Sequence, residues 1–329
     1  MDFDGIVGQK EIKEALMAAV QTGKVGHAYI LSGPRGIGKK SVARIFAKQL
    51  LCQELKDGKC CNGCMPCRLL ANGTNPDFSE INPEEGSIGV EEIRKIHSEI
   101  NIRPLYSNKK VYLIADAERM TVQAQNSLLK TLEEPPSYGV ILLTVSNYGA
   151  LLETIRSRAV KYSFRKNSPE EVKTLLKAKF GHSPQNLEFI AAYADGIIGS
   201  ALELAGSEEF IRLRQDVLDI VQKLESSKLS EILKLYGFFE DNKSDVDTVL
   251  DIMLLFYRDL LAFKNTGDEY VLINSDKKDI ILNSVSAYTT ARITRNIDLI
   301  EAARRNIKQN ANYQLSIEVM LMKLQEEEV

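Results

Sequence analysis

Residues 27–41 read HAYILSGPRGIGKKS, and this stretch decides the fold of the chain. Its apolar start predicts a buried strand, and the spacing of Val42, Ile45 and Phe46 beyond it predicts a helix over Lys39–Leu51. A glycine-rich turn lies between the two. A strand, such a turn and a helix in this order predict a phosphate-binding loop, because glycines let backbone N–H groups surround a phosphate and the helix N-terminus adds partial positive charge.

The residues of this loop suit a phosphate better than they suit a metal. The candidate nucleotide-binding residues are Gly33, Gly36, Gly38, Lys39, Lys40 and Ser41. Lys39 would reach the outer phosphates, and the next position normally carries Ser or Thr to hold Mg²⁺. Here that position is Lys40, whose ammonium group cannot ligate a cation. The pattern predicts P-loop ancestry. The alternative is a glycine-rich turn that binds no ligand. Whether the loop binds ATP or ADP stays open.

A second segment also departs from an active ATPase. Such enzymes place an Asp after the next core strand to position Mg²⁺, and in many of them an adjacent Glu activates the attacking water. After the predicted strand Lys110–Ile114, the chain has Ala115 and Asp116 instead. Ala115 has no carboxylate to position the ligands around Mg²⁺, and the Asp116 side chain is one methylene shorter than that of Glu. In an alternative register Asp116 is the metal partner and Ala117 stands in place of the base, so both readings predict impaired hydrolysis.

Strand and helix patterns alternate through the first half of the chain and predict an α/β fold with a parallel sheet covered on both faces. Further strands are expected at Phe78–Ile81, Lys110–Ala115, Val140–Val145 and Val160–Phe164. After Ser168 the strand signals nearly vanish, and helical periodicity continues to the end. We therefore expect three domains: a P-loop domain at 1–165 with a metal-binding insert at 52–67, a small helical lid at 166–208, and an all-α domain at 209–329.

The five cysteines of the chain all lie within sixteen residues, which favours a metal over a disulfide framework. Four of them form a C-x8-C-x2-C-x2-C pattern: Cys52, Cys61, Cys64 and Cys67. Four thiolates suit tetrahedral Zn²⁺ and leave no open position, so we expect a structural zinc ion. An iron–sulfur cluster is the alternative, although nothing else in the sequence indicates redox chemistry. Cys60 is either surplus or a substitute for Cys61.

The net charge, the apolar runs and the N-terminal sequence argue against several classes of protein. A net charge of −3 gives no strong overall field toward DNA or membranes. The sequence has no apolar run of about 18 residues and its acidic N-terminus has no signal-peptide pattern, so neither a membrane span nor secretion is predicted. We expect a cytoplasmic location, where thiols stay reduced.

Several segments together resemble the bacterial DNA polymerase III clamp-loader ATPases of the AAA+ class, over most of residues 1–205. They are the box at residues 7–9 (VGQ), the P-loop stretch, the cysteine module after the P-loop helix, residues 126–136 (NSLLKTLEEPP) and residues 154–159 (TIRSRA). The last segment is similar to the Ser-Arg-Cys segment of the family, with Ala159 in place of cysteine. The resemblance implies an AAA+, RecA-like P-loop domain followed by a lid and a helical collar.

Within this family the departures favour the delta-prime branch. The tau/gamma subunits are its working ATPases and are expected to have Ser or Thr after the P-loop lysine, an Asp-Glu pair and a lid arginine. Gly199 falls where that arginine would stand, which is a third departure after Lys40 and Ala115. The delta-prime branch shares the fold, the zinc module and the Ser-Arg segment but typically does not hydrolyse ATP.

The resemblance implies that Arg158 is an arginine finger acting in trans, with Arg156 as a supporting or substitute donor. Its planar, permanently charged group would reach the γ-phosphate held by a neighbouring tau/gamma subunit. An ordinary surface arginine is the alternative. The implied partners are the tau/gamma and delta subunits, the sliding clamp, and primed DNA reached through the complex; Lys130 either faces that DNA or is merely solvated.

Three other functions stay open at this stage. The chain could be an active tau/gamma-like ATPase in which Ser41 serves the metal and Asp116 serves catalysis. It could be a zinc-stabilised protein that binds nucleic acid alone, although its near-neutral charge counts against this. It could also pair with ATPases outside replication.

Overall fold

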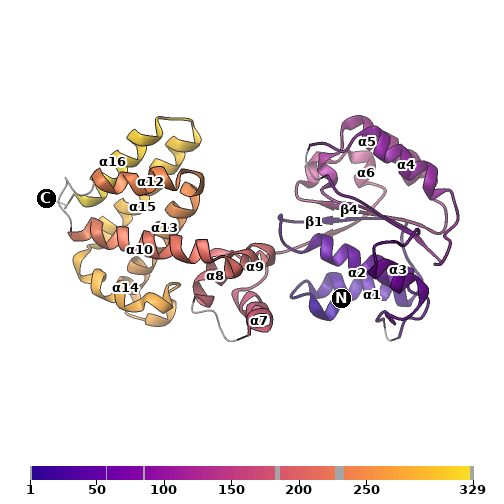
Figure 1. Cartoon of the computed structure of the whole chain (residues 1–329), viewed down its shortest axis with the longest axis horizontal. Helices are drawn as coiled ribbons and strands as arrows, with labels where there is room; N and C mark the ends of the chain where they lie inside the picture. Colours follow the sequence, from indigo (N-terminus) through magenta and orange to yellow (C-terminus); the bar gives the residue numbers. More distant parts are fainter. Residues whose placement is uncertain (1, 57, 84–85, 182–185, 227–232, 327–329) are drawn as a thin grey trace. The chain divides into compact units, whose positions relative to one another are not determined.

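The computed structural model describes residues 2–56, 58–83, 86–181, 186–226 and 233–326 (Figure 1). The chain divides into two compact units. The first holds residues 1–175 and 194–200, and the second holds residues 176–193 and 201–329. No helix in the described ranges is long and apolar enough to cross a bilayer.

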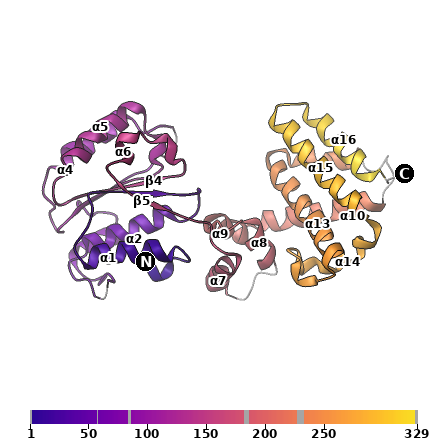
Figure 2. The same ribbon diagram turned by 180° about the vertical axis from the view of Figure 1, so that it is seen from behind.

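The first unit is built on a five-stranded parallel sheet with the order β2-β3-β4-β1-β5. Its strands are β1 (Ala28–Ser32), β2 (Phe78–Ile81), β3 (Lys110–Ile114), β4 (Gly139–Val145) and β5 (Val160–Ser163). On one face lie α1 (Lys10–Gln21), α2 (Lys39–Leu51) and α3 (Met65–Ala71). On the other lie α4 (Val90–Ile100), α5 (Val122–Glu133) and α6 (Glu153–Arg156), as Figures 1 and 2 show from opposite sides. The predicted parallel sheet with two covered faces is confirmed.

Two apolar cores, one on each face, explain why the central strands carry continuous apolar runs. In β1, Tyr29 and Leu31 pack into the core under α1 and α2, whereas Ala28 and Ile30 pack into the core under α4 and α5. Successive side chains of a strand point to opposite faces, so a strand covered on both faces has no position that faces water. All residues of β1, β3 and β4 are accordingly buried.

The segment predicted as a lid contains three helices: α7 (Pro169–Phe180), α8 (Leu187–Tyr193) and α9 (Ile198–Gly206). The division between the two units passes through this segment, since residues 194–200 belong to the first unit and α8 belongs to the second. The limits at 165 and 208 stay predictions.

The described part of the second unit is entirely helical, as predicted. Its longer helices are α10 (Glu208–Ser226), α13 (Val246–Thr266), α15 (Thr290–Lys308) and α16 (Tyr313–Gln325), with the shorter α12 (Tyr236–Asp241) and α14 (Lys278–Ser284) beside them. Thr289 caps α15 by accepting from Arg292 N, and Asn312 caps α16 by accepting from Leu315 N. These caps satisfy backbone donors that the helix itself leaves free.

A buried arginine ties several parts of this helical unit together. Arg214 is 2% exposed, lies 3.9 Å from the centroid of the Phe189 ring and donates to Asn274 and Asp276. Asp259, which is fully buried, accepts from the backbone of Asn274 at 2.7 Å. A buried charge needs such partners because desolvation would otherwise destabilise the fold. Within the second unit, Arg214 on α10 therefore joins α8 to the segment between α13 and α14.

Candidate functional site

The P-loop leaves β1 at its carboxyl end and leads into α2, and its glycines adopt backbone angles that favour glycine. The φ angles of Gly36 and Gly38 are 78° and 101°. Lys39 is 6% exposed, and its Nζ donates to Gly33 O at 2.7 Å, Pro34 O at 2.8 Å and Ser146 Oγ at 3.1 Å. Lys39 thus braces the loop against the end of β4.

Acidic groups near Lys39 moderate the electrostatic cost of its burial. Burial lowers the pKa of Lys39, and the carboxylates of Glu118 and Asp116 counteract part of that shift. Glu118 also accepts from Ser146 N at 2.9 Å. Neither Glu118 nor Ser146 was singled out from the sequence. A usable signal existed for Ser146, because it directly follows β4 and the carboxyl ends of parallel strands meet at one edge of the sheet.

A cavity of about 330 Å³ opens beside the loop, and it gathers most of the candidate nucleotide-binding residues. Its lining is Arg35, Gly36, Gly38, Lys39, Lys40, Ser41, Asn82, Pro83, Ala115, Asp116 and Thr144. Gly33 is not in that lining but contacts Lys39. The cavity joins the ends of β1 and β3 as the sequence suggested, and the role of these residues as nucleotide ligands stays a prediction.

Lys40 turns toward the edge of the sheet. Its Nζ donates to Asn82 Oδ1 at 2.5 Å and lies 3.0 Å from Glu80 Oε1. Arg44 binds the same carboxylate with two hydrogen bonds of 2.8 Å. Burial would raise the pKa of Glu80, but the hydrogen bonds from Arg44 and Lys40 outweigh it and hold the pKa below its ordinary value. An ammonium group therefore stands at the position after Lys39, where an active site needs a hydroxyl.

The second departure lies on the same cavity. Ala115 and Asp116 both line it, and Asp116 adopts a left-handed backbone with φ 47° while its N–H donates to Thr144 Oγ1 at 3.1 Å. Ala117, the base position in the alternative register, is fully buried in the core beneath α4 and α5. Neither register places a Glu after a metal-binding Asp.

The third departure, Gly199, lies against the P-loop backbone. Gly199 N donates to Gly36 O at 2.9 Å. A Cβ atom at position 199 would lie 2.8 Å from Gly36 O and 3.1 Å from Gly36 Cα. The arrangement therefore has no room for the lid arginine of a working ATPase.

Adding one methyl group at this contact is expected to destabilise the first unit. Gly199→Ala should lower the free energy of unfolding by about 1–3 kcal/mol, because the crowded atoms are backbone and cannot rotate away. Gly206→Ala, at the other end of α9, is the control, since a Cβ there meets nothing within 4 Å. Urea unfolding of the two variants checks this, and equal stability would show that the lid contact is not fixed.

Arg158 and the P-loop lie at opposite ends of the parallel strands. It follows α6 and precedes β5, so it lies near the amino end of that strand, whereas the P-loop follows the carboxyl end of β1. Its Nη1 donates to Thr154 O at 3.0 Å, and its Nη2 lies 3.0 Å from Glu133 Oε1. Arg156 instead packs its guanidinium over the Tyr148 ring at 5.4 Å. Lys130 is exposed on α5.

The four cysteines of the predicted pattern come together in a single cluster. The sulfur atoms of Cys52, Cys61, Cys64 and Cys67 all lie within 4.8 Å of one another. Cys52 ends α2, and Cys64 and Cys67 lie at the start of α3, a helix that the sequence analysis did not predict. Cys60 is outside this group of four. The donor set and spacing fit a tetrahedral ion closed to substrate.

The thiols of the cluster differ in how readily they ionise. Backbone N–H groups of Cys64 and Gly63 lower the pKa of Cys61 to about 7. Burial raises the pKa of Cys67, and it raises the pKa of Cys60 to about 12. Buried thiolates need a cation to offset their desolvation, which is what a bound metal supplies.

Comparison with known proteins gives consistent matches. Residues 8–168 match the family described as DNA polymerase III, delta subunit, and residues 208–326 match its C-terminal family. DNA polymerase III subunit delta' of Pseudomonas aeruginosa is 30% identical over 301 residues, covering 90% of each chain. The Bacillus subtilis delta' is 29% identical over 322 residues, covering 97% of this chain and 96% of that one.

Two further matches show how far the similarity extends. Subunit tau of Bacillus subtilis is 28% identical over 346 residues, covering 98% of this chain, which spans only 61% of the length of that relative. Among solved structures, a gamma subunit-related protein of Thermotoga maritima superimposes with a TM-score of 0.49 at 23% identity, covering 95% of this chain and 99% of that one.

Proposed function

This chain belongs to the delta-prime family of bacterial DNA polymerase III, and from that membership we propose that it is a non-hydrolysing stator of the clamp loader. In this role it completes the ATPase site of a neighbouring tau/gamma subunit. Its other partners would be the delta subunit, the sliding clamp, and primed DNA reached through the complex, in the cytoplasm. The zinc ion held by Cys52, Cys61, Cys64 and Cys67 would be structural.

The position of Lys40 carries the first half of this proposal. Its ammonium group stands where a working P-loop has a hydroxyl ligand for Mg²⁺, and Glu80 and Asn82 hold it there. Ala115 and Gly199 remove two further parts of the machinery, the metal-positioning carboxylate and the lid arginine. Without an ordered Mg²⁺, the charge that develops on a transferring phosphoryl group is not neutralised, so hydrolysis by this chain is not expected.

The placement of Arg158 supports the second half. Arg158 lies at the amino ends of the strands and the P-loop lies at their carboxyl ends, so the guanidinium cannot reach a phosphate held by the P-loop of its own chain. Its side chain is 37% exposed and can meet another molecule. A guanidinium binds phosphate oxygens in a planar, two-pronged way and stays charged at all working pH values. In trans it would stabilise the charge of the transition state on a neighbour's γ-phosphate.

An ATPase assay with this chain alone, and added to tau/gamma and delta with primed DNA and clamp, tests the proposal. We expect no turnover alone and a marked increase in the mixture. Lys39→Ala is the decisive variant, because it should leave the mixed rate within about twofold if this P-loop does not hydrolyse ATP. Robust turnover by the isolated chain, abolished by Lys39→Ala, would identify it as an active ATPase instead.

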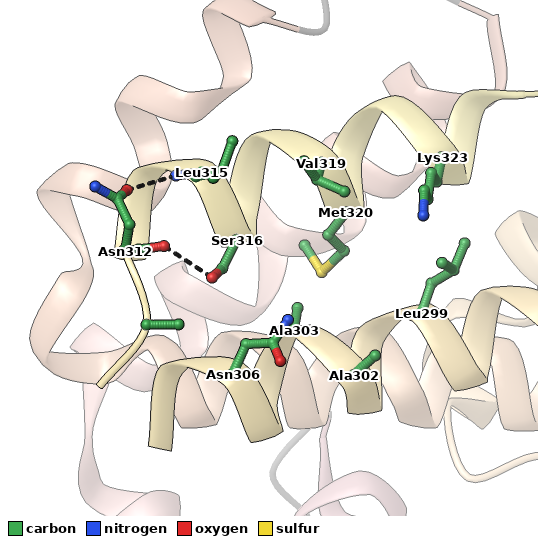
Figure 3. Close-up of a pocket in the computed structure, with 11 residues that line it drawn as sticks. Leu299, Ala302, Ala303, Asn306, Asn312, Leu315, Ser316, Val319, Met320 and Lys323 are labelled. Carbon is green, nitrogen blue, oxygen red and sulfur yellow. Dashed lines mark hydrogen bonds between the residues drawn. The ribbon is translucent and has the colours of Figure 1, made fainter. Parts of the chain in front are cut away.

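The helical second unit would supply the collar through which the subunits assemble, and a groove between α15 and α16 suits such a contact. The groove has a volume of about 400 Å³. Its apolar lining is Leu299, Ala302, Ala303, Leu315, Val319 and Met320, and Asn306, Asn312, Ser316 and Lys323 add polar groups (Figure 3). Leu315 and Val319 are 60% and 39% exposed, four residues apart on α16. Residues at this spacing share one face of a helix.

A charge in this groove is expected to weaken assembly. Val319→Asp should raise the dissociation constant for tau/gamma and delta by about tenfold or more, because the interface would have to remove a carboxylate from water. Ile211→Asp is a matched control, since Ile211 is 40% exposed on α10 and does not line the groove. Analytical ultracentrifugation measures both, and equal assembly of the two variants would rule out this groove.

A further inference from the structure

The guanidinium group of Arg158 is held by three contacts within its own chain. Nη1 donates to Thr154 O at 3.0 Å and to Ser157 Oγ at 3.4 Å. Nη2 lies 3.0 Å from Glu133 Oε1. Thr154 and Ser157 belong to the short segment around α6 that carries Arg158 itself. Glu133 is the last residue of α5, so it alone fixes the side chain to a different helix.

These contacts leave part of the guanidinium group available to another molecule. Arginine has five N–H donors, and the contacts within the described part of the chain use at most three of them: two hydrogen bonds from Nη1 and the ion pair of Nη2 with Glu133. At least two donors remain, which is enough for the bidentate pair that a guanidinium forms with a phosphate. The Arg158 side chain is 37% exposed, so these donors are accessible while Glu133 still holds Nη2.

Other charges around Arg158 do not offer the same contact. Of the described residues, Glu133 is the one carboxylate within ion-pair distance of Arg158. Glu134 is the next residue along the chain and is exposed. The pair between two half-exposed side chains contributes little to folding because water and salt screen it. Its importance therefore lies in where it places the guanidinium group.

We propose that Glu133 is a positioning residue for Arg158, an inference that rests on the proposed function. A free arginine side chain samples many rotamers and loses this freedom when it docks. Glu133 restricts those rotamers before the neighbouring subunit arrives, so less freedom is lost when the guanidinium meets the γ-phosphate. Supporting a catalytic group through a second residue in this way raises the rate of the chemical step and leaves ATP binding unchanged.

The test measures ATPase kinetics of the complex assembled with Glu133→Gln, which keeps the shape of the side chain and removes its charge. We expect kcat to fall by about two- to fivefold, the ratio that corresponds to an exposed ion pair, with an unchanged KM for ATP. Glu133→Asp retains the charge and should restore part of the loss. Glu134→Gln is the matched control and should behave as wild type. The deficit of Glu133→Gln should shrink as salt rises, because salt screens the pair it removes.

A double-mutant cycle separates this inference from the proposed function. If Glu133 acts through Arg158, Glu133→Gln has no further effect once Arg158 is alanine. The inference is overturned if Arg158→Ala abolishes the stimulation while Glu133→Gln matches wild type, or if Glu133→Gln lowers the rate equally in both backgrounds. If Arg158→Ala itself leaves the rate unchanged, the proposed trans finger is wrong and the role of Glu133 falls with it.

Discussion

Replacing Arg158 with alanine is expected to lower turnover at the ATPase site next to this chain by about 10³-fold, the lower range for an arginine finger. The loss comes from the transition state, where negative charge builds up on the γ-phosphate and a guanidinium would neutralise it. Binding of ATP to the neighbouring subunit should change little. The measurement is the increase in ATPase rate that this chain adds to tau/gamma and delta, compared between wild type and variant.

Two control variants sharpen that experiment. Arg158→Lys keeps the charge but loses the planar pair of donors, so it should recover only a small part of the rate. Arg156→Ala removes the neighbouring arginine, which lies over the Tyr148 ring, and should leave most of the stimulation intact if Arg158 is the finger. If Arg156→Ala removes the stimulation and Arg158→Ala does not, the roles of the two arginines are exchanged.

Replacing Cys64 with serine is expected to weaken zinc binding by more than about 100-fold, since changes that merely touch the partners of a ligand already cost 10–100-fold. Cys64 supplies one of the four clustered sulfur atoms, and its backbone N–H also donates to Cys61 Sγ at 3.2 Å. The cysteine module has little apolar core of its own, so loss of the metal should unfold it locally. Zinc content and amide exchange across residues 52–71 measure both effects.

Cys60→Ser provides the control for the zinc experiment, because Cys60 lies outside the group of four. It should retain one zinc ion per chain and normal amide protection. Loss of zinc in Cys60→Ser together with its retention in Cys61→Ser would show that the module uses the other spacing. Iron in place of zinc in the purified protein would establish the alternative cluster.

The elements of the sheet could be predicted from the sequence because their patterns have one physical cause. The predicted helix Lys39–Leu51 and strand Phe78–Ile81 have the same bounds in the structure, and the apolar runs of β1 and β4 are strands buried on both faces. Short helices were missed. α3 spans seven residues beside the cysteines and α6 spans four, which is too short for apolar periodicity to show.

The candidate site could be predicted only where chemistry follows one local motif. The P-loop residues and four cysteines are close in sequence, so their grouping could be predicted. Glu118 and Glu133 enter through contacts across the fold, and neither spacing nor composition indicates such contacts. The Gly36–Gly199 contact joins residues 163 positions apart. A sequence shows that an arginine is missing at position 199, but not that the P-loop backbone fills its place.

The contact between Lys40 and Glu80 has a consequence for any attempt to build an active ATPase site on this P-loop. Glu80 belongs to β2, an edge strand, and its carboxylate binds both Lys40 and Arg44. Replacing Lys40 with threonine would supply a hydroxyl for Mg²⁺ and at the same time take one of its two cations from that carboxylate. Charged groups along an edge strand also discourage pairing with other chains. For the non-hydrolysing stator proposed above, a gain of ATPase activity would therefore require coordinated changes at Lys40, Ala115 and Gly199.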